Sequence, residues 1–152
     1  MDNEKLKDFI LKQIPEAEFE ENAQYLLAIV PASHIHSISL ELKNNPETRF
    51  DYLFCLTGVD YPDHMQVIYH LKSTELNHYT VIKARIDSRE KPEIDTVCDI
   101  WHTAEFHERE VYDLFGIVFR NHPDLRRIFL DEEWVGYPLR KDYKDPYNMI
   151  EY

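Results

Sequence analysis

The spacing of apolar residues along the chain predicts where its helices lie. From Asn3 to Ile14 these residues recur every three or four positions, which indicates a helix that Pro15 ends. A second helical pattern starts at Ile35 and runs towards Asn44-Asn45-Pro46, a combination that stops helices. The apolar residues of the second pattern mark one side of the helix, so that side is expected to pack against a core.

Five other stretches have the composition of β-strands. The first two cover residues 16–20 and 25–30, and the shorter of them is the weaker signal. Three more cover residues 50–57, 65–71 and 78–86, and short polar turns join them, which predicts a meander of consecutive strands. The last stretch alternates in the way of a strand, although both of its faces carry apolar residues.

The second half of the chain contains a third helical pattern. Residues Thr96 to Asp99 resemble a capping box with Asp in the place of Glu, so a helical region is predicted to open there. We expect it to break near Thr103, to continue to Phe115 and to end at Gly116, a natural C-cap. Beyond Gly116 the pattern is irregular and rich in turn-forming and charged residues.

Strands in the middle of the chain with helices grouped at either end favour an α+β fold. We expect a mixed, mostly antiparallel sheet packed by helices on one side, followed by an irregular C-terminal segment. The 152 residues, of which 43% are apolar, are enough for one core, so residues 1–143 are interpreted as a single domain and residues 144–152 as a tail. The order of the strands does not follow from the sequence.

Charge and cysteine content exclude several classes of function. A net charge of −12 argues against nucleic-acid binding and against direct adsorption to anionic membranes, because both need a basic face. No stretch approaches the roughly 18 apolar residues that a membrane span needs, so work at a membrane would require a partner protein. Cys55 and Cys98 lie far apart in apolar contexts, which indicates core residues in a reducing compartment rather than a metal or redox motif.

Glycine and cysteine are too sparse for the common cofactor sites. The three glycines are widely separated, so the chain lacks the closely spaced glycines of a dinucleotide-binding loop. Two cysteines cannot supply the four thiolates of an iron–sulfur cluster. A metal site built from His102, Glu105, His107 and Glu108 is the sharpest remaining hypothesis, but their spacing and the missing HExxH order favour a solvated helix surface.

Arginine, aromatic and turn-forming residues concentrate between Glu108 and Tyr143. The last 48 residues contain five Arg and two Lys, whereas the first 104 contain three Arg and seven Lys. Because guanidinium groups bind carboxylates in a fixed fork and stack on rings, this block is expected to hold fixed contacts. Glu105, Arg109 and Asp113 are spaced four residues apart, which predicts a ladder in which Arg109 bridges two carboxylates.

The arginines of this block are expected to differ in their partners. Arg109 is predicted to be tied into its own helix, whereas Arg126, Arg127 and Arg140 are the stronger candidates for contacts that leave the chain. Arg126 and Arg127 are predicted to project outward as a pair, and their anions could be the chain's own acidic run at 131–133 or the carboxylates of another protein. Trp, Tyr and Arg grouped on irregular backbone anchor protein interfaces, so a binding surface explains this block better than catalysis does.

Three motifs in the block are shared with a known family. Residues 108–117 read EREVYDLFGI, residues 122–128 read HPDLRRI, and residues 134–143 read WVGYPLRKDY. In this order and at these spacings they resemble the C subunit of the proton-pumping NADH:quinone oxidoreductase, respiratory complex I, while the preceding sheet region agrees in general pattern only. Asn121 stands where the family has glycine before His-Pro, and because asparagine also tolerates left-handed backbone, the turn is expected to survive.

The resemblance implies an α+β subunit of the peripheral arm that carries no cofactor and packs on the D subunit of the complex, beside the quinone-reducing module. It implies that NADH, FMN, iron–sulfur clusters and quinone bind to partner subunits, that other peripheral-arm subunits are also partners, and that the chain is held at the cytoplasmic face of the bacterial inner membrane. No residue is assigned a catalytic role. The structural and interface candidates are Glu108, Arg109, Glu110, Asp113, His122, Asp124, Arg126, Arg127, Trp134, Arg140, Lys141 and Asp142.

Two alternatives stay open at this point. The same motifs recur in the equivalent subunit of membrane-bound hydrogenases and of other quinone-reducing complexes. The alternative from a different class is a stand-alone metal-dependent hydrolase that uses His102, Glu105 and His107.

Overall fold

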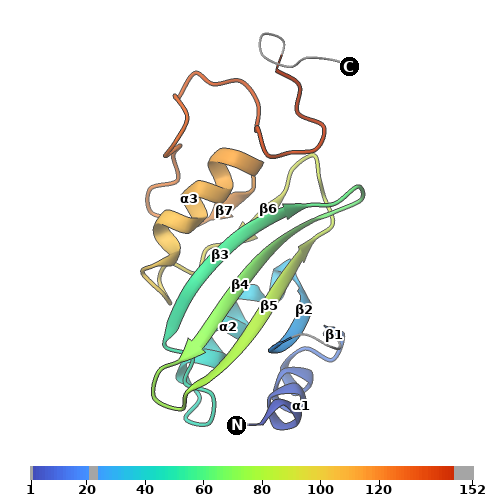
Figure 1. Cartoon of the computed structure of the whole chain (residues 1–152), viewed down its shortest axis with the longest axis vertical. Coiled ribbons are helices and arrows are strands. Elements are labelled where there is room, and N and C mark those ends of the chain that lie inside the picture. The colour runs from blue at the N-terminus through green and yellow to red at the C-terminus, as the bar shows by residue number, and fades with distance from the viewer. Residues whose placement is uncertain (1, 21–23, 146–152) are drawn as a thin grey trace.

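The computed structural model describes residues 2–20 and 24–145 (Figure 1). Most of the predicted tail at 144–152 lies outside these residues. In chain order the elements are α1 (Asn3–Gln13), β1 (Glu18–Glu20), β2 (Leu26–Pro31), a 3-10 turn (Ala32–His34), α2 (Ile35–Asn44), β3 (Tyr52–Asp60), β4 (Met65–Ser73), β5 (His78–Ile86), β6 (Glu93–Asp95), α3 (Ala104–Phe115) and β7 (Val118–Arg120).

Five of the strands form one mixed sheet in the order β1-β2-β5-β4-β3. Its neighbours are antiparallel except for β2 and β5, which pair in parallel with Leu26 opposite Thr80. This parallel pair is possible because α2 and two strands of the meander lie between β2 and β5 in the sequence, enough chain for a crossover. The predicted meander and the predicted fold class, a mostly antiparallel α+β sheet, are confirmed.

The core lies between the sheet and the helices that cover one of its faces, with α2 directly behind the strands in the view of Figure 1. Strand register places Leu56, Tyr69 and Ile82 side by side on the inner face. Ile10 of α1 and Leu42 of α2, both fully buried, belong to the same core. Burying an apolar side chain of this size contributes about 1.5–3 kcal/mol, so these contacts fix how the helices sit on the sheet.

Strand β3 runs further than the sequence predicts, through Gly58 to Asp60. The prediction placed Gly58 in a turn, but the residue is part of the strand at the point where α3 crosses it. A Cβ atom at Gly58 would lie 2.9 Å from Cδ2 of Phe115 and 3.0 Å from Cγ1 of Val111. Glycine is therefore needed here for close approach of the helix and not for chain reversal.

The predicted capping box at Thr96 to Asp99 is wrong, and α3 begins only at Ala104. The Thr96 hydroxyl accepts the N–H of Cys98 and donates to the carboxylate of Glu108, so it caps a turn and reaches across to α3. Asp99 contacts His36 of α2 instead of a helix N-terminus. Tertiary partners have overridden the local capping signal.

The strands β6 and β7 form a parallel pair in which Ile94 lies opposite Phe119, and neither strand was predicted from the sequence. Each strand has three residues and only one buried apolar side chain, which is too little for a readable alternation. The C-cap at Gly116 is confirmed by its left-handed backbone, with φ of 71°. Asn121, which follows β7, is left-handed as predicted, with φ of 64°.

Replacing Gly58 with alanine is expected to lower the free energy of unfolding by about 1–3 kcal/mol, because the new methyl group overlaps the side chain of Phe115. Urea unfolding followed by circular dichroism measures this change. The control is Thr57→Ala, one residue away on the exposed face, which should stay within about 0.5 kcal/mol of the wild type. Equal stability of Gly58→Ala and wild type would contradict this account of how α3 packs on β3.

Candidate docking site

Residues 121–145, here called the C-terminal segment, contain no helix or strand and arch over α3 (Figure 1). The segment is fixed by polar side chains of α3 and of the sheet, since it has no regular secondary structure of its own. Most of the motif residues singled out in the sequence belong to these contacts.

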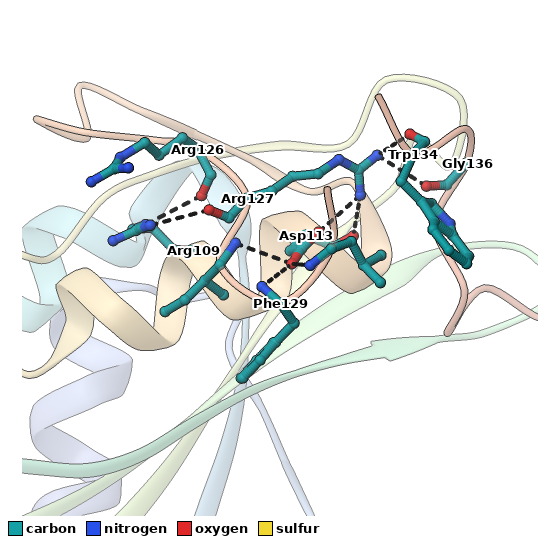
Figure 2. A network of polar contacts seen from close by, with 9 residues as sticks. Arg109, Asp113, Arg126, Arg127, Phe129, Trp134 and Gly136 are labelled. Carbon is teal, nitrogen blue, oxygen red and sulfur yellow. Dashed lines mark hydrogen bonds and ion pairs between the residues drawn. The ribbon is translucent and has the colours of Figure 1, made fainter. Parts of the chain in front are cut away.

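The carboxylate of Asp113 is the first anchor of the segment (Figure 2). It is fully buried on α3, and its Oδ2 accepts the backbone N–H groups of Ile128, Phe129 and Leu130 at 3.1, 2.7 and 3.0 Å. Its Oδ1 accepts a hydrogen bond from Arg127 at 2.8 Å. Burial alone would raise the pKa of Asp113, but Arg127 and the three N–H groups more than offset burial, so the pKa lies below 3.8.

The guanidinium groups of Arg127 and Arg109 donate hydrogen bonds to backbone carbonyls of the segment (Figure 2). Arg127 donates to the carbonyls of Trp134 at 2.9 Å and Gly136 at 3.1 Å, in addition to Asp113. Arg109 donates to the carbonyls of Arg126 and Arg127 at 3.2 and 3.1 Å. The predicted ladder, in which Arg109 bridges carboxylates of its own helix, is therefore wrong, because the segment's carbonyls take its donors.

The predicted outward pair of arginines divides into one buried and one exposed side chain. Arg127 is 11% exposed and turned inward, whereas Arg126 is 61% exposed and pairs with Asp124 at 2.9 Å. The ion-pair partners of the two arginines are thus Asp113 and Asp124, not the acidic run at 131–133. An exposed pair such as Arg126–Asp124 contributes only about 0–1 kcal/mol.

A second anchor holds the far end of the segment against the sheet. Asp60, at the end of β3, accepts two hydrogen bonds from Arg89 at 2.9 Å each and one from the backbone N–H of Lys141 at 2.9 Å. Arg140 donates to the carbonyl of Phe115 at 2.6 Å, and Asp142 lies 3.7 Å from Arg89. Asp60 and Arg89 were not predicted from the sequence as site residues. No local pattern links them to the motif block, which begins far away at Glu108.

Tyr137 packs between the two anchors. Its ring lies under the guanidinium groups of Arg127 and Arg140, whose central carbons are 5.2 and 5.0 Å from the ring centre. It also covers Gly116, where a Cβ atom would lie 2.5 Å from Cε2 of the tyrosine. Gly116 therefore serves twice, as the left-handed end of α3 and as the bare backbone on which the ring rests.

Glu108 and His122 form a buried polar junction at the start of the segment. Glu108 is fully buried, and its carboxylate accepts hydrogen bonds from the Thr96 hydroxyl and from the N–H of Val97, the latter at 2.8 Å. Burial is the main reason that the pKa of Glu108 rises to about 7. The His122 ring accepts the N–H of Asp124 at Nδ1 and donates from Nε2 to the carbonyl of Glu105, both at 3.0 Å.

The structure does not gather His102, Glu105 and His107 as metal ligands. In the described part of the chain, the group whose ligand atoms lie within 4.8 Å of one another is Cys98, Glu108 and His122. Its hydrogen bonds do not suit a metal ion: Nδ1 of His122 accepts an N–H, so the neutral ring carries its proton on Nε2, the atom that would have to coordinate. The arrangement supports structural cross-linking rather than metal binding.

Between its anchors the segment exposes apolar side chains, among which Trp134 was predicted from the sequence as a contact and Phe129, Val135 and Leu139 were not. Val135 is 87% exposed, Phe129 64%, Leu139 53% and Trp134 38%. On α3, Phe106 is also exposed, and it lines a shallow hollow of about 350 Å³ with Thr103, His107, Glu110, Ile128 and Phe129. Large exposed apolar side chains on a fixed backbone are characteristic of surfaces that bind other proteins.

Asp113→Asn should loosen the segment and lower the free energy of unfolding by about 3 kcal/mol, because it removes one partner of a buried ion pair. Amide hydrogen exchange at Ile128, Phe129 and Leu130 measures the loosening directly. The control is Asp124→Asn, which removes the exposed partner of Arg126 and should cost less than about 1 kcal/mol. Similar exchange in both variants would show that Asp113 is not the anchor of the segment.

Lowering the pH should loosen the C-terminal segment of the wild type, as Asp113→Asn does. The folded pKa of Asp113 is depressed below 3.8, so its stabilising contribution is present above pH 3.8 and is lost as the pH falls through the folded pKa. Protection of the same three amides should therefore fall in this acid range in the wild type. Asp113→Asn should show no such step at these amides.

Among residues 2–20 and 24–145, no helix has both the length and the apolar character that a membrane crossing requires. In the search of solved structures, a component of the membrane-bound sulfane sulfur reductase, an archaeal respiratory membrane complex, is similar to this chain. The TM-score is 0.76 and the sequence identity 33%, over 93% of this chain and 85% of that chain.

Curated relatives share this similarity in sequence. The NADH-quinone oxidoreductase C subunit of Chlorobium phaeobacteroides is 47% identical over 110 residues, which cover 70% of this chain and 66% of the relative. The NADH-quinone oxidoreductase C/D subunit of Phocaeicola vulgatus is 48% identical over 122 residues, which cover 80% of this chain and 23% of the relative. The chain thus spans less than two thirds of either relative.

The family described as "Respiratory-chain NADH dehydrogenase, 30 Kd subunit" matches residues 28–148. That range contains strands β3, β4 and β5 of the sheet as well as the three motifs, so the similarity is not confined to the motif block. It confirms the resemblance seen in the sequence. The chain belongs to the 30 Kd subunit family of respiratory-chain NADH dehydrogenases.

Proposed function

We propose that the chain is a cofactor-free peripheral-arm subunit of a proton-translocating NADH:quinone oxidoreductase and that it docks on the D subunit, which helps to form the quinone site. The observation that carries this proposal is the C-terminal segment, whose backbone is held from within while its apolar side chains face outward. A segment that is rigid before it binds loses little conformational entropy on binding, so it is suited to docking.

Fused relatives support the D subunit as the partner. In Phocaeicola vulgatus the matching sequence belongs to a protein named as a C/D subunit of NADH-quinone oxidoreductase, of which the matched part covers 23%. A name that joins two subunits indicates that both are one polypeptide there. Two subunits that occur as one polypeptide must lie within reach of each other, which favours direct contact between them where they are separate chains.

The residues proposed to contact the partner are not the ones that the motifs alone suggest. Arg109, Arg127 and Arg140 are occupied by the chain's own carbonyls, so their proposed role is to hold the docking surface in shape. Phe129 and Val135 are proposed as the side chains that enter the partner. Charged groups at the edge, such as the Arg126–Asp124 pair, would tune specificity more than affinity.

The remaining parts of the proposal follow from the family. NADH, FMN, iron–sulfur clusters and quinone are assigned to partner subunits, and this chain is given no catalytic site of its own. It would support electron transfer by holding the redox subunits together. Partner subunits would also account for its place at the cytoplasmic face of the bacterial inner membrane.

A second candidate function is the equivalent place in another respiratory membrane complex. The similarity to a component of the sulfane sulfur reductase complex, at 33% identity over most of both chains, favours keeping this candidate. The docking surface would be the same, but the electron donor would differ. Mass spectrometry of the native complex purified through this chain separates the two, since only the first complex contains subunits that oxidise NADH.

The double variant Phe129→Asp with Val135→Asp should abolish co-purification with the D subunit, because it places charge on two side chains that are 64% and 87% exposed and proposed to be buried by the partner. The variant should remain folded, since neither side chain belongs to the core. A pull-down from membranes, quantified by mass spectrometry, is expected to show at least a tenfold loss of the D subunit.

The matched control is Leu40→Asp on α2, an apolar residue that is 43% exposed and lies outside the proposed surface. It should co-purify the D subunit at the wild-type level. Normal recovery of the D subunit with the double variant would rule out these two side chains as the docking contacts. A variant that lost its circular dichroism spectrum would be replaced by the single change Val135→Asp, for which the same loss is expected.

A further inference from the structure

A pocket of about 400 Å³ lies on the outer face of the sheet, the face turned away from α2 and towards the viewer in Figure 1. It is lined by residues of four neighbouring strands, from β1 through β2 and β5 to β4. Strand register places Glu18 opposite Ile29, and Arg85 lies between Pro31 and Gln66. Because neighbouring strands lie about 4.8 Å apart, the pocket extends across the sheet for about 14 Å.

The pocket carries an excess of negative charge. Four carboxylates line it against one guanidinium group: Glu16, Glu18, Glu20 and Asp87 against Arg85. Three of these carboxylates have a basic side chain of the protein at 3.2 Å or less. The fourth, Glu18 on β1, lies within electrostatic reach of Arg85 but makes no hydrogen bond or ion pair within residues 2–20 and 24–145. Its carboxylate can therefore bind a cation from outside the chain.

Gln66 of β4 brings an unpaired acceptor to the same pocket. The residue is 6% exposed, and its amide oxygen Oε1 is buried without a hydrogen-bond partner in the described part of the chain. Nδ1 of His64 lies 2.8 Å from Oδ1 of Asp63, so the neutral ring carries its proton there and its Nε2 accepts the Gln66 amide at 3.2 Å. Tyr61 stacks on this ring at 4.5 Å, which holds the ring in place. The amide nitrogen is thus occupied, and the oxygen is left for a donor.

A donor that enters the pocket can reach this oxygen. Gln66 lines the pocket, and because the last torsion of a glutamine side chain is soft, a rotation turns Oε1 towards an incoming N–H group. Leaving a buried acceptor unpaired costs free energy, so a ligand that donates to it recovers that cost.

These groups together define the chemistry of a ligand. Glu18 suits a positive charge and Oε1 of Gln66 suits an N–H group, while the side chains of Ile29 and Pro31 suit methylene groups. Among the described residues, the acidic side chains of this pocket do not converge within 4.8 Å of one another as the ligands of a metal ion do. An aliphatic polyamine supplies ammonium groups, N–H donors and methylene groups in one extended molecule.

We propose that the pocket binds a free aliphatic polyamine that lies across the sheet, with one ammonium group at Glu18 on β1 and another that donates to Oε1 of Gln66 on β4. A lysine of another subunit offers the same ammonium chemistry but carries one charge, whereas a pocket that crosses four strands matches a ligand with a charge at each end. The proposal does not rest on the docking function, because α3, which holds the C-terminal segment, packs on the other face of the sheet.

Titration calorimetry of the full chain with spermidine, at pH 8, where histidine rings are neutral, and at about 0.15 M salt, tests the site. Glu18→Gln and Gln66→Leu should each weaken binding by at least about fivefold, because each removes one polar contact of the ligand. The matched control is Glu93→Gln, which removes the same charge from an exposed position on β6 outside the pocket and should stay within about twofold of the wild type. Equal weakening by Glu18→Gln and Glu93→Gln would show attraction to the net charge alone and would overturn the proposal.

Two diamines of equal charge test whether the ligand spans the pocket. The wild type should bind 1,8-diaminooctane at least about threefold more tightly than 1,3-diaminopropane, because only the longer molecule reaches from Glu18 to Gln66. This preference should be lost in Gln66→Leu. Equal affinity of the wild type for the two diamines would contradict a ligand that lies across the sheet.

Nuclear magnetic resonance places the ligand without any variant. The side-chain amide signals of Gln66, assigned by triple-resonance experiments, should shift when spermidine is added to the wild type. Binding without this shift would rule out the pocket as the site, whether or not Gln66→Leu folds. Recovery of the D subunit with Glu18→Gln should equal that of the wild type, and a loss would identify a lysine of the partner, not a free polyamine, as the source of the ammonium group.

Discussion

The hydrogen bonds between the Asp113 carboxylate and three consecutive backbone N–H groups are the contact on which the rest of the C-terminal segment depends. A segment without helix or strand leaves its backbone donors and acceptors without regular partners, and leaving such groups buried and unpaired costs about 1–3 kcal/mol each. Asp113 takes up the donors, and the guanidinium groups of Arg109 and Arg127 take up the acceptors. Charged side chains here satisfy the backbone hydrogen-bonding groups, as a neighbouring strand does in a sheet.

This role changes how the motif residues of the family are understood. Dense arginines and carboxylates are easily interpreted as a surface that waits for a partner, yet Arg127 and Asp113 satisfy each other and the backbone within the chain. The side chains left for a partner are apolar ones between the charges, such as Phe129 and Val135. Polar residues thus set the shape of the surface, and apolar residues supply the area that binding would bury.

Regular elements were predictable from the sequence where their apolar period was long enough. The helix at Asn3–Gln13 and the strand at His78–Ile86 lie within a residue of where the pattern places them, and Gly116 ends α3 as its conformational freedom suggests. The strands β6 and β7 were too short to leave a period. Thr96 was misread because a hydroxyl that caps a helix and one that reaches a buried carboxylate look alike in sequence.

The candidate site was predictable in location but not in its bonding. The motif block from Glu108 to Tyr143 does contain the segment, but carbonyl acceptors carry no sequence signal, so the true partners of Arg109 could not be found. The link from Lys141 to Asp60 crosses 81 residues and depends on how α3 lies on β3, which only the folded core determines. The interface role of the motif residues stays a prediction that co-purification can test.

The hydrogen bond between Lys141 and Asp60 also sets an order of folding steps. A bond between residues 81 positions apart cannot form until the sheet that carries Asp60 has been assembled, and closing so long a loop is slow compared with forming a hairpin. The exposed apolar side chains of the segment therefore take up fixed positions only on a subunit whose core is complete. The proposed docking surface would thus be complete only on a finished subunit.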